Sequence, residues 1–214
     1  DWTALVRQQY LDLLLLTPTA DRVAPWVSQL QAGTTTPVDL ITFFMTSSTA
    51  VKEVHPVLRA FLACYRRVPT RAELTTQVGR ARSSGLRAAC DSLVGATEFR
   101  TRNGTLDDTG FVRWAYRAAF GVYPSATSLA AWKAELTSRR RTRGGVLAAY
   151  LMDARCVSRY RYEVPAAFLY VGMLHRAPAT TYWTARVNQL RAGTPLRTLV
   201  AEFFGTSEYA GRFP

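Results

Sequence analysis

The sequence contains little lysine, histidine or cysteine, and each shortage argues against a class of site. Of its 27 cationic residues only Lys52 and Lys133 are lysines, so arginine carries the positive charge. Two isolated histidines, His55 and His175, and three cysteines without CxxC spacing do not form a zinc-binding motif. We therefore expect neither a metal ion nor a cofactor.

Long hydrophobic runs are also missing. The longest apolar stretch, residues 166–174, is far shorter than the roughly 20 residues that a membrane-spanning helix needs. A chain of 214 residues with 48% hydrophobic residues can still bury a sizeable core, as one large domain or two small ones. The composition predicts a globular protein with no membrane span.

Catalytic motifs are absent as well. No glycine-rich phosphate loop occurs, and residues 205–209 (GTSEY) lack the closing glycine of a nucleophile elbow. The nearest candidates for the carboxylate pair of a glycoside hydrolase are Glu98, Asp107 and Asp108, but adjacent aspartates before a helix are typical caps. We predict that the protein is not an enzyme, and a hydrolase is the least favoured alternative.

The cysteines leave two arrangements open. Cys64 and Cys90 could form a disulfide and leave Cys156 free, or all three could be small buried apolar side chains. The odd number excludes a dense disulfide framework, but the sequence does not decide between the two arrangements.

The charge that is present is strongly positive and unevenly placed. Lysine and arginine number 27 and acidic residues 15, a net charge of +12. The stretch 59–161 holds 19 basic and 7 acidic residues, whereas the two flanks together hold 8 of each. Arginine suits bidentate contact with carboxylate, phosphate or sulfate. The middle of the chain therefore predicts an anionic partner.

The chain contains four related segments, each built around one proline. Twelve, eight and four residues before each proline stands an apolar or aromatic residue, a spacing that places all three on one helix face. A proline cannot continue a helix, so each repeat opens with a helix that ends just before it. The four prolines, spaced by 51, 55 and 54 residues, are Pro18, Pro69, Pro124 and Pro178.

Two further helices are expected in each repeat. Thr19, Thr70 and Ser125 follow three of the prolines and are suitable N-caps for a second helix, which Gly33 and Gly193 end in repeats one and four. A third helix then carries an apolar pair. The prediction is an all-α protein of about twelve helices, in four tandem three-helix repeats packed as a compact helical array.

The most polar stretch, residues 101–110, falls between repeats two and three. We expect it to separate two halves, 1–104 with repeats one and two and 105–214 with repeats three and four. These halves would form either one continuous helical domain or two paired ones.

Several short motifs recur in these repeats. Arg-x-Pro occurs at residues 67–69 and 176–178, a tryptophan in the second helix at Trp26 and Trp132, and an acidic-aromatic ending at residues 98–99 and 208–209. With these motifs the whole chain resembles the bacterial repeat family catalogued as domain of unknown function 4214. That family is similar to the helical linker domain of phycobilisomes. The resemblance implies a secreted or cell-surface module without catalytic activity.

The match to this family is uneven. Leu16 and Val122 replace the arginine of Arg-x-Pro in repeats one and three. In the same two repeats Ser48-Thr49 and Arg155-Cys156 replace the acidic-aromatic ending.

Two arginine-rich clusters are the candidate ligand-binding residues. One is a loop with four closely spaced arginines, and the other interleaves arginine with tyrosine, which suits sugar rings that bear carboxylates and also stacked bases. The candidates are Arg139, Arg140, Arg141, Arg143, Arg155, Arg159, Tyr160, Arg161 and Tyr162.

We therefore predict a carbohydrate-binding module, secreted or at the cell surface of a bacterium, whose partner is an acidic polysaccharide or anionic cell-wall polymer. The alternative is an assembly module that docks an acidic protein. Nucleic acid matches the charge, but no recognised nucleic-acid-binding motif is present, so we do not expect it.

Overall fold

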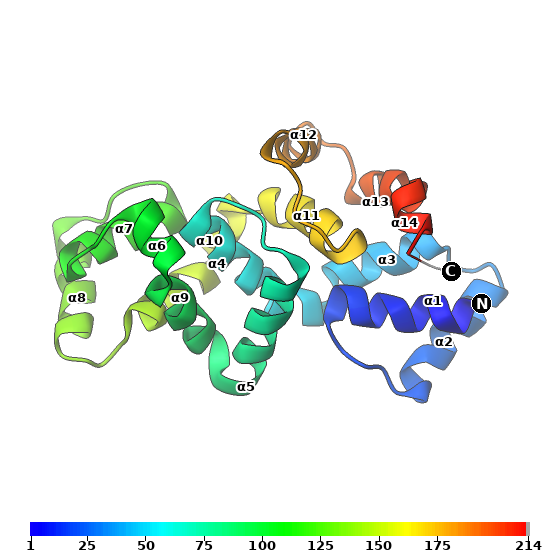
Figure 1. Ribbon diagram of the computed structural model, residues 1–214, viewed down its shortest axis with the longest axis horizontal. Coiled ribbons are helices and arrows are strands. Elements are labelled where there is room, and N and C mark those ends of the chain that lie inside the picture. Colours follow the sequence, from blue (N-terminus) through cyan, green and yellow to red (C-terminus); the bar gives the residue numbers. More distant parts are fainter. Residues whose placement is uncertain (213–214) are drawn as a thin grey trace. The chain divides into compact units, whose positions relative to one another are not determined.

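A computed structural model describes residues 1–212 of the chain, and throughout them the secondary structure is helical, with no strand (Figure 1). This confirms the all-α prediction. These residues contain fourteen α-helices and three short π-helical segments. None of the helices described is both long and apolar enough to cross a bilayer.

The chain divides into two compact units. Unit 1 comprises residues 1–54, 70–72 and 162–214, and unit 2 comprises residues 55–69 and 73–161. Repeats one and four thus share one unit, and repeats two and three share the other. This division does not follow the halves 1–104 and 105–214 that the sequence suggested.

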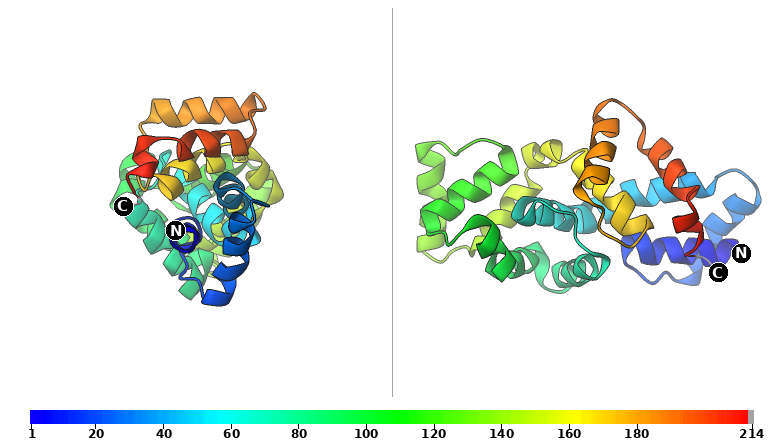
Figure 2. Two further views of the ribbon diagram at one scale, coloured as in Figure 1. Left: turned by 90° about the vertical axis from the view of Figure 1, so that its right-hand side faces the viewer. Right: turned by 45° about the horizontal axis from the view of Figure 1, so that its top comes forward.

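Unit 1 is built around the first helices of repeats one and four. Each of them changes from α- to π-helical geometry, and the two π-segments pack together, as do α3 and α13. Helices α1 and α14 also lie near each other in every view (Figures 1 and 2). The elements are α1 (Trp2–Gln9), η1 (Tyr10–Leu14), α2 (Ala20–Gln31), α3 (Pro37–Thr46), η2 (Ala50–Val54), α11 (Glu163–Phe168), η3 (Leu169–Met173), α12 (Thr180–Arg191), α13 (Leu196–Phe204) and α14 (Ser207–Ala210).

The close approach of η1 and η3 depends on a glycine. A Cβ added at Gly172 would lie 2.8 Å from the Cδ2 atom of Leu13, which is buried. The apolar stretch 166–174 of the sequence is this core segment. Polar contacts also join the two repeats, since Arg197 Nε donates to Asp39 Oδ1 at 2.7 Å.

Unit 2 centres on α4, which packs against α7 and α9. Helix α5 is interrupted at Gly85, whose φ of 81° is outside the helical region, so α5 contains both the second and the third helix of repeat two. The elements are α4 (His55–Tyr65), α5 (Arg71–Gly95), α6 (Thr97–Asn103), α7 (Asp108–Phe120), α8 (Ala126–Thr137), α9 (Arg143–Met152) and α10 (Ala154–Arg159).

The order of elements fits three-helix repeats with one addition. After the third helix, repeats two, three and four each carry a further short helix, namely α6, α10 and α14. These short helices begin where the acidic-aromatic endings, or their replacements, stand in the sequence. They were not predicted, because segments of four to seven residues are too short to show helical periodicity.

Each repeat ends its first helix in the same unusual backbone conformation. Three residues before the four prolines the chain turns left-handed, at Leu15 (φ 54°), Arg66 (53°), Gly121 (80°) and His175 (56°). Only one of these positions is glycine, the residue that adopts this region without strain.

A second left-handed position follows the second helix. Gly33 and Gly193 occupy it in repeats one and four, with φ of 68° and 93°, which confirms the predicted helix stops. In repeat three the corresponding residue is Arg139, with φ of 58°. Repeat three thus holds an arginine where repeats one and four have glycine.

We expect Arg139→Gly to stabilise the protein slightly. The left-handed strain on a non-glycine residue, about 1–2 kcal/mol, exceeds the roughly 0.5–1 kcal/mol that glycine loses through its greater unfolded freedom. The free energy of unfolding, measured in urea, should rise by about 0.5 kcal/mol. Arg140→Gly is the matched control, because it removes a neighbouring exposed arginine where φ is not positive. Equal stability of the two variants would contradict this reading of the backbone.

Candidate anion-binding site

The charge of the chain separates between the units. Unit 2 holds 18 basic and 7 acidic residues, a net charge of +11, whereas unit 1 holds 9 and 8. Any site for an anion that depends on charge is therefore expected in unit 2.

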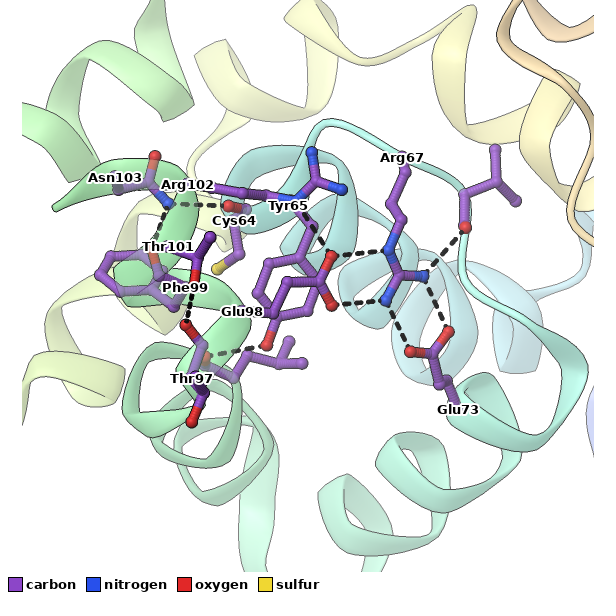
Figure 3. A network of polar contacts seen from close by, with 12 residues as sticks. Cys64, Tyr65, Arg67, Glu73, Thr97, Glu98, Phe99, Thr101, Arg102 and Asn103 are labelled. Carbon is purple, nitrogen blue, oxygen red and sulfur yellow. Dashed lines mark hydrogen bonds and ion pairs between the residues drawn. The ribbon is translucent and has the colours of Figure 1, made fainter.

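Part of this charge is used to hold the fold. In repeat two Arg67 lies between two carboxylates (Figure 3). Its Nη2 atom is 2.6 Å from Glu73 Oε1 and 2.7 Å from Glu98 Oε2, and its guanidinium also lies over the rings of Phe61 and Tyr65. The arginine of Arg-x-Pro thus pairs with the glutamate of the acidic-aromatic ending.

Repeat four repeats this arrangement. Arg176 Nη2 donates to Glu208 Oε2 at 2.9 Å, and the guanidinium lies over the ring of Tyr170. We call this pair, Arg67–Glu98 or Arg176–Glu208, the repeat clamp. Because its two halves form one interaction, they are present together in repeats two and four and replaced together in repeats one and three.

Repeat three has lost the clamp and is organised differently there. Arg155, at the place of the glutamate, pairs with Asp153 at 2.9 Å and lies 4.3 Å from the ring centre of Phe120. Val122, at the place of the clamp arginine, is 60% exposed, and the next residue, Tyr123, is 62% exposed. The loop after the first helix of repeat three therefore presents apolar side chains to solvent.

Beside this loop lies a cleft of about 680 Å³ within unit 2. It is bounded by the C-terminal ends of α4 and α10 and by the length of α7, and no acidic residue lines it. Four arginines do so: Arg66, Arg113, Arg117 and Arg159. Three aromatic residues lie among them: Trp114, Tyr123 and Tyr160.

Local contacts hold the walls of the cleft. Tyr160 donates its hydroxyl to the carbonyl of Ala118 at 2.9 Å, and burial raises the pKa of Tyr160 to about 12, so it remains a neutral donor. Arg117 Nη1 donates to the Tyr123 hydroxyl at 2.6 Å. Arg159 lies so close to the backbone of Gly121 that a Cβ there would collide with its guanidinium.

The arginines of the cleft are not neutralised. Within residues 1–212 none of the four forms an ion pair with a carboxylate, and Arg113 and Arg117 stand one helical turn apart on the exposed side of α7. Like charges at this spacing repel one another by a few tenths of a kcal/mol. A bound anion would relieve this repulsion, which is the electrostatic basis of an anion site.

The predicted arginine loop lies elsewhere in unit 2. Arg139, Arg140 and Arg141 are exposed between α8 and α9, beside a smaller hollow of about 460 Å³. Glu135 partly neutralises them, since it is 3.7 Å from Arg140 and 3.5 Å from Arg141.

Arg143 belongs to the fold more than to this loop. Its Nη2 atom donates to Asp108 Oδ1 at 2.9 Å and to the carbonyl of Leu106 at 2.8 Å, and its guanidinium lies over the ring of Phe111. The expectation that Arg143 is an exposed ligand contact is therefore not supported by its position.

The second predicted cluster is only partly in the cleft. Arg159 and Tyr160 line it, whereas Arg155 is paired with Asp153. Arg161 donates to the carbonyl of Ser158 at 2.9 Å and is the last residue of unit 2, and Tyr162 belongs to unit 1.

The other lining residues were missed because they come from separate helices. One signal was available in the sequence: Arg113 and Arg117 form a like-charged pair four residues apart, without an acidic residue at the same spacing.

Several other polar residues have structural partners. Arg59 is 4% exposed and donates from Nε to the carbonyl of Leu151 at 3.0 Å, near the end of α9; burial lowers its pKa. The basic stretch 59–161 is therefore not all surface. Asp107 caps α7 by accepting from the amide of Gly110, as the sequence suggested for one of the two aspartates.

The cysteines are free and buried, so no disulfide joins Cys64 and Cys90. Burial raises the pKa of Cys90 to about 12 and that of Cys156 to about 11, which keeps both as unreactive thiols. In the described part of the chain, no three histidine, cysteine, aspartate or glutamate side chains form a group that could hold a metal ion.

No model of a known protein family matches the chain, and a comparison with characterised proteins finds no match.

Proposed function

We propose that unit 2 is a non-catalytic module that binds an acidic polysaccharide or an anionic polymer of the cell envelope. The observation that carries this proposal is the cleft, in which four unneutralised arginines and three aromatic side chains surround an open space of about 680 Å³ without an acidic residue. Guanidinium groups recognise carboxylates and related anions through paired hydrogen bonds. Aromatic rings offer flat apolar surfaces on which sugar rings pack.

The cellular location that we propose for the module rests on the sequence resemblance. Repeats of the family that the chain resembles occur in secreted and surface proteins, which supports a location where envelope polymers are accessible. The absence of a clustered nucleophile, base and oxyanion donor in the cleft supports binding without turnover.

A titration with polygalacturonate tests the proposal. The double variant Arg113→Gln/Arg159→Gln should weaken binding by at least about tenfold, because each arginine can make charge-assisted hydrogen bonds worth about 1.5–3 kcal/mol. Raising the salt from 0.1 to 1 M should also weaken wild-type binding steeply, since the screening length falls from roughly 10 to roughly 3 Å.

The matched control is Arg140→Gln/Arg141→Gln, which removes the same charge from the loop beside Glu135. It should change affinity much less than the cleft variant. Equal losses would show that the total charge, rather than the cleft, determines binding. If wild-type protein binds no acidic polysaccharide but retains one acidic protein, the module is an assembly domain instead.

A further inference from the structure

We infer that the cleft takes one uronate residue of an acidic polysaccharide, with its sugar ring stacked on Tyr123 and its carboxylate bound by the arginines beside it. This inference rests on the proposed function and specifies its ligand. It is carried by the way repeat three differs from the other repeats at one position.

Tyr123 stands immediately before the repeat proline, where repeats one, two and four have Thr17, Val68 and Ala177. Val68 is buried at 4% exposure, and Thr17 and Ala177 are small exposed side chains, whereas Tyr123 is a large aromatic ring that is 62% exposed. A large aromatic ring in solvent beside four arginines has no role in the packing of the repeat, and this points to a ligand contact.

The ring of Tyr123 is held in place for stacking. The Arg117 guanidinium lies 5.0 Å from its centre, at the hydroxyl end of the ring, where Arg117 Nη1 donates to the hydroxyl. Pro124 restricts the backbone of Tyr123 to extended conformations. The ring is therefore anchored at its hydroxyl end, and its large exposed fraction leaves ring surface available for a flat ligand.

The contact between ring and charge selects the type of ligand. Because Arg117 touches Tyr123 directly, the site requires an anionic group very close to the ring that stacks. A uronate has its carboxylate bonded to a ring carbon. In a nucleotide the base and the phosphate are separated by a ribose, and a polyphosphate has no ring at all. The uronate therefore fits this spacing best.

Tyrosine variants test the stacking. With galacturonate oligomers as the probe, Tyr123→Ala should weaken binding at least fivefold, whereas Tyr123→Phe, which keeps the ring and loses the hydrogen bond from Arg117, should weaken it clearly less. Tyr182→Ala is the matched control, since Tyr182 in unit 1 is 66% exposed and does not line the cleft. It should leave affinity unchanged.

The choice of probe tests the ligand class. Methyl-esterified galacturonate oligomers and polyphosphate should each bind wild-type protein more weakly than the free acid, and Tyr123→Ala should not affect polyphosphate. A Tyr123→Ala variant that binds galacturonate as well as wild type, or a stronger effect on oligothymidylate than on galacturonate, would overturn the inference. If salt-dependent binding persists in that case, the proposed function stands; if wild type binds none of these polyanions, both fail.

Discussion

Replacing Asp12 with alanine should lower the free energy of unfolding by about 3–5 kcal/mol, because it leaves partly buried cationic and polar groups without the carboxylate that they share. Asp12 is 1% exposed in the core of unit 1. Its carboxylate is 2.8 Å from His175 Nε2 and 2.7 Å from Arg212 Nη2, and it accepts from Gln8 Nε2 at 2.8 Å. No other carboxylate in the described residues has as many side-chain partners in so buried a place.

The effect of Asp12 should depend on pH in a defined direction. Burial acts to raise the pKa of Asp12, but the hydrogen bond and charge of His175 and the charge of Arg212 outweigh it, so the pKa lies below its usual value. A depressed carboxyl pKa contributes stability that is present above about pH 4 and is lost as the pH falls through the folded-state pKa. The difference in stability between wild type and Asp12→Asn should therefore shrink between pH 5 and pH 2.

Urea unfolding at pH 7 and at low pH measures both effects. Asp21→Asn serves as the control, because Asp21 lies in the same unit on the exposed first turn of α2, and it should change stability by no more than about 0.5 kcal/mol. A loss under about 1 kcal/mol for Asp12→Ala at pH 7 would show that the cluster is not formed in solution.

Arg67→Ala should cost about 2 kcal/mol, the second largest effect that we expect. Arg67 binds two carboxylates, donates to the carbonyl of Val68 and lies over two aromatic rings, so its removal leaves Glu73 and Glu98 close together without a shared cation. Hydrogen bonding to Arg67 also holds the pKa of Glu98 below its usual value. Arg67→Lys should recover little, since an ammonium group cannot make two bidentate pairs.

Arg102→Ala is the control that distinguishes the contribution of the clamp from that of an exposed ion pair with the same glutamate. Arg102 also pairs with Glu98, at 3.0 Å and one helical turn away, but its side chain is more exposed, and such pairs contribute only about 0.3–0.5 kcal/mol. Thermal unfolding measures the loss of stability in each variant. Equal losses of stability in Arg67→Ala and Arg102→Ala would indicate that the clamp is no stronger than an ordinary surface ion pair.

Local features of the fold could be predicted because they depend on neighbouring residues. The positions twelve, eight and four before each proline face the core, as Val6, Tyr10 and Leu14 show in repeat one. The glycine stops were also predicted correctly, as was a cap at one of the two aspartates Asp107 and Asp108. Each of these signals lies within one or two helical turns.

The grouping of the repeats could not be predicted in the same way. It depends on contacts such as that of Leu13 with Gly172, which lie far apart in the sequence and leave no trace in its periodicity. The cleft could not be predicted for the same reason, since Arg66 follows α4 whereas Arg117 and Arg159 lie in α7 and α10. The high density of arginine in the sequence instead led us to predict the ligand site at residues 139–143. There Glu135 partly neutralises Arg141, and Asp108 pairs with Arg143.

The grouping of repeats one and four also has a consequence for how the chain is completed during synthesis. All residues of unit 2 precede residue 162, whereas the bonds of Asp39 with Arg197 and of Asp12 with Arg212 join residues 158 and 200 positions apart. At roughly 5–20 residues per second, the first 54 residues must wait several seconds after unit 2 has emerged for their partners. Once folded, unit 2 shortens the effective loop between the two halves of unit 1 and so reduces the entropy lost in closing it. The nascent species most exposed to aggregation is thus the half-built neutral unit, with the apolar face of η1 uncovered, and not the arginine-rich one.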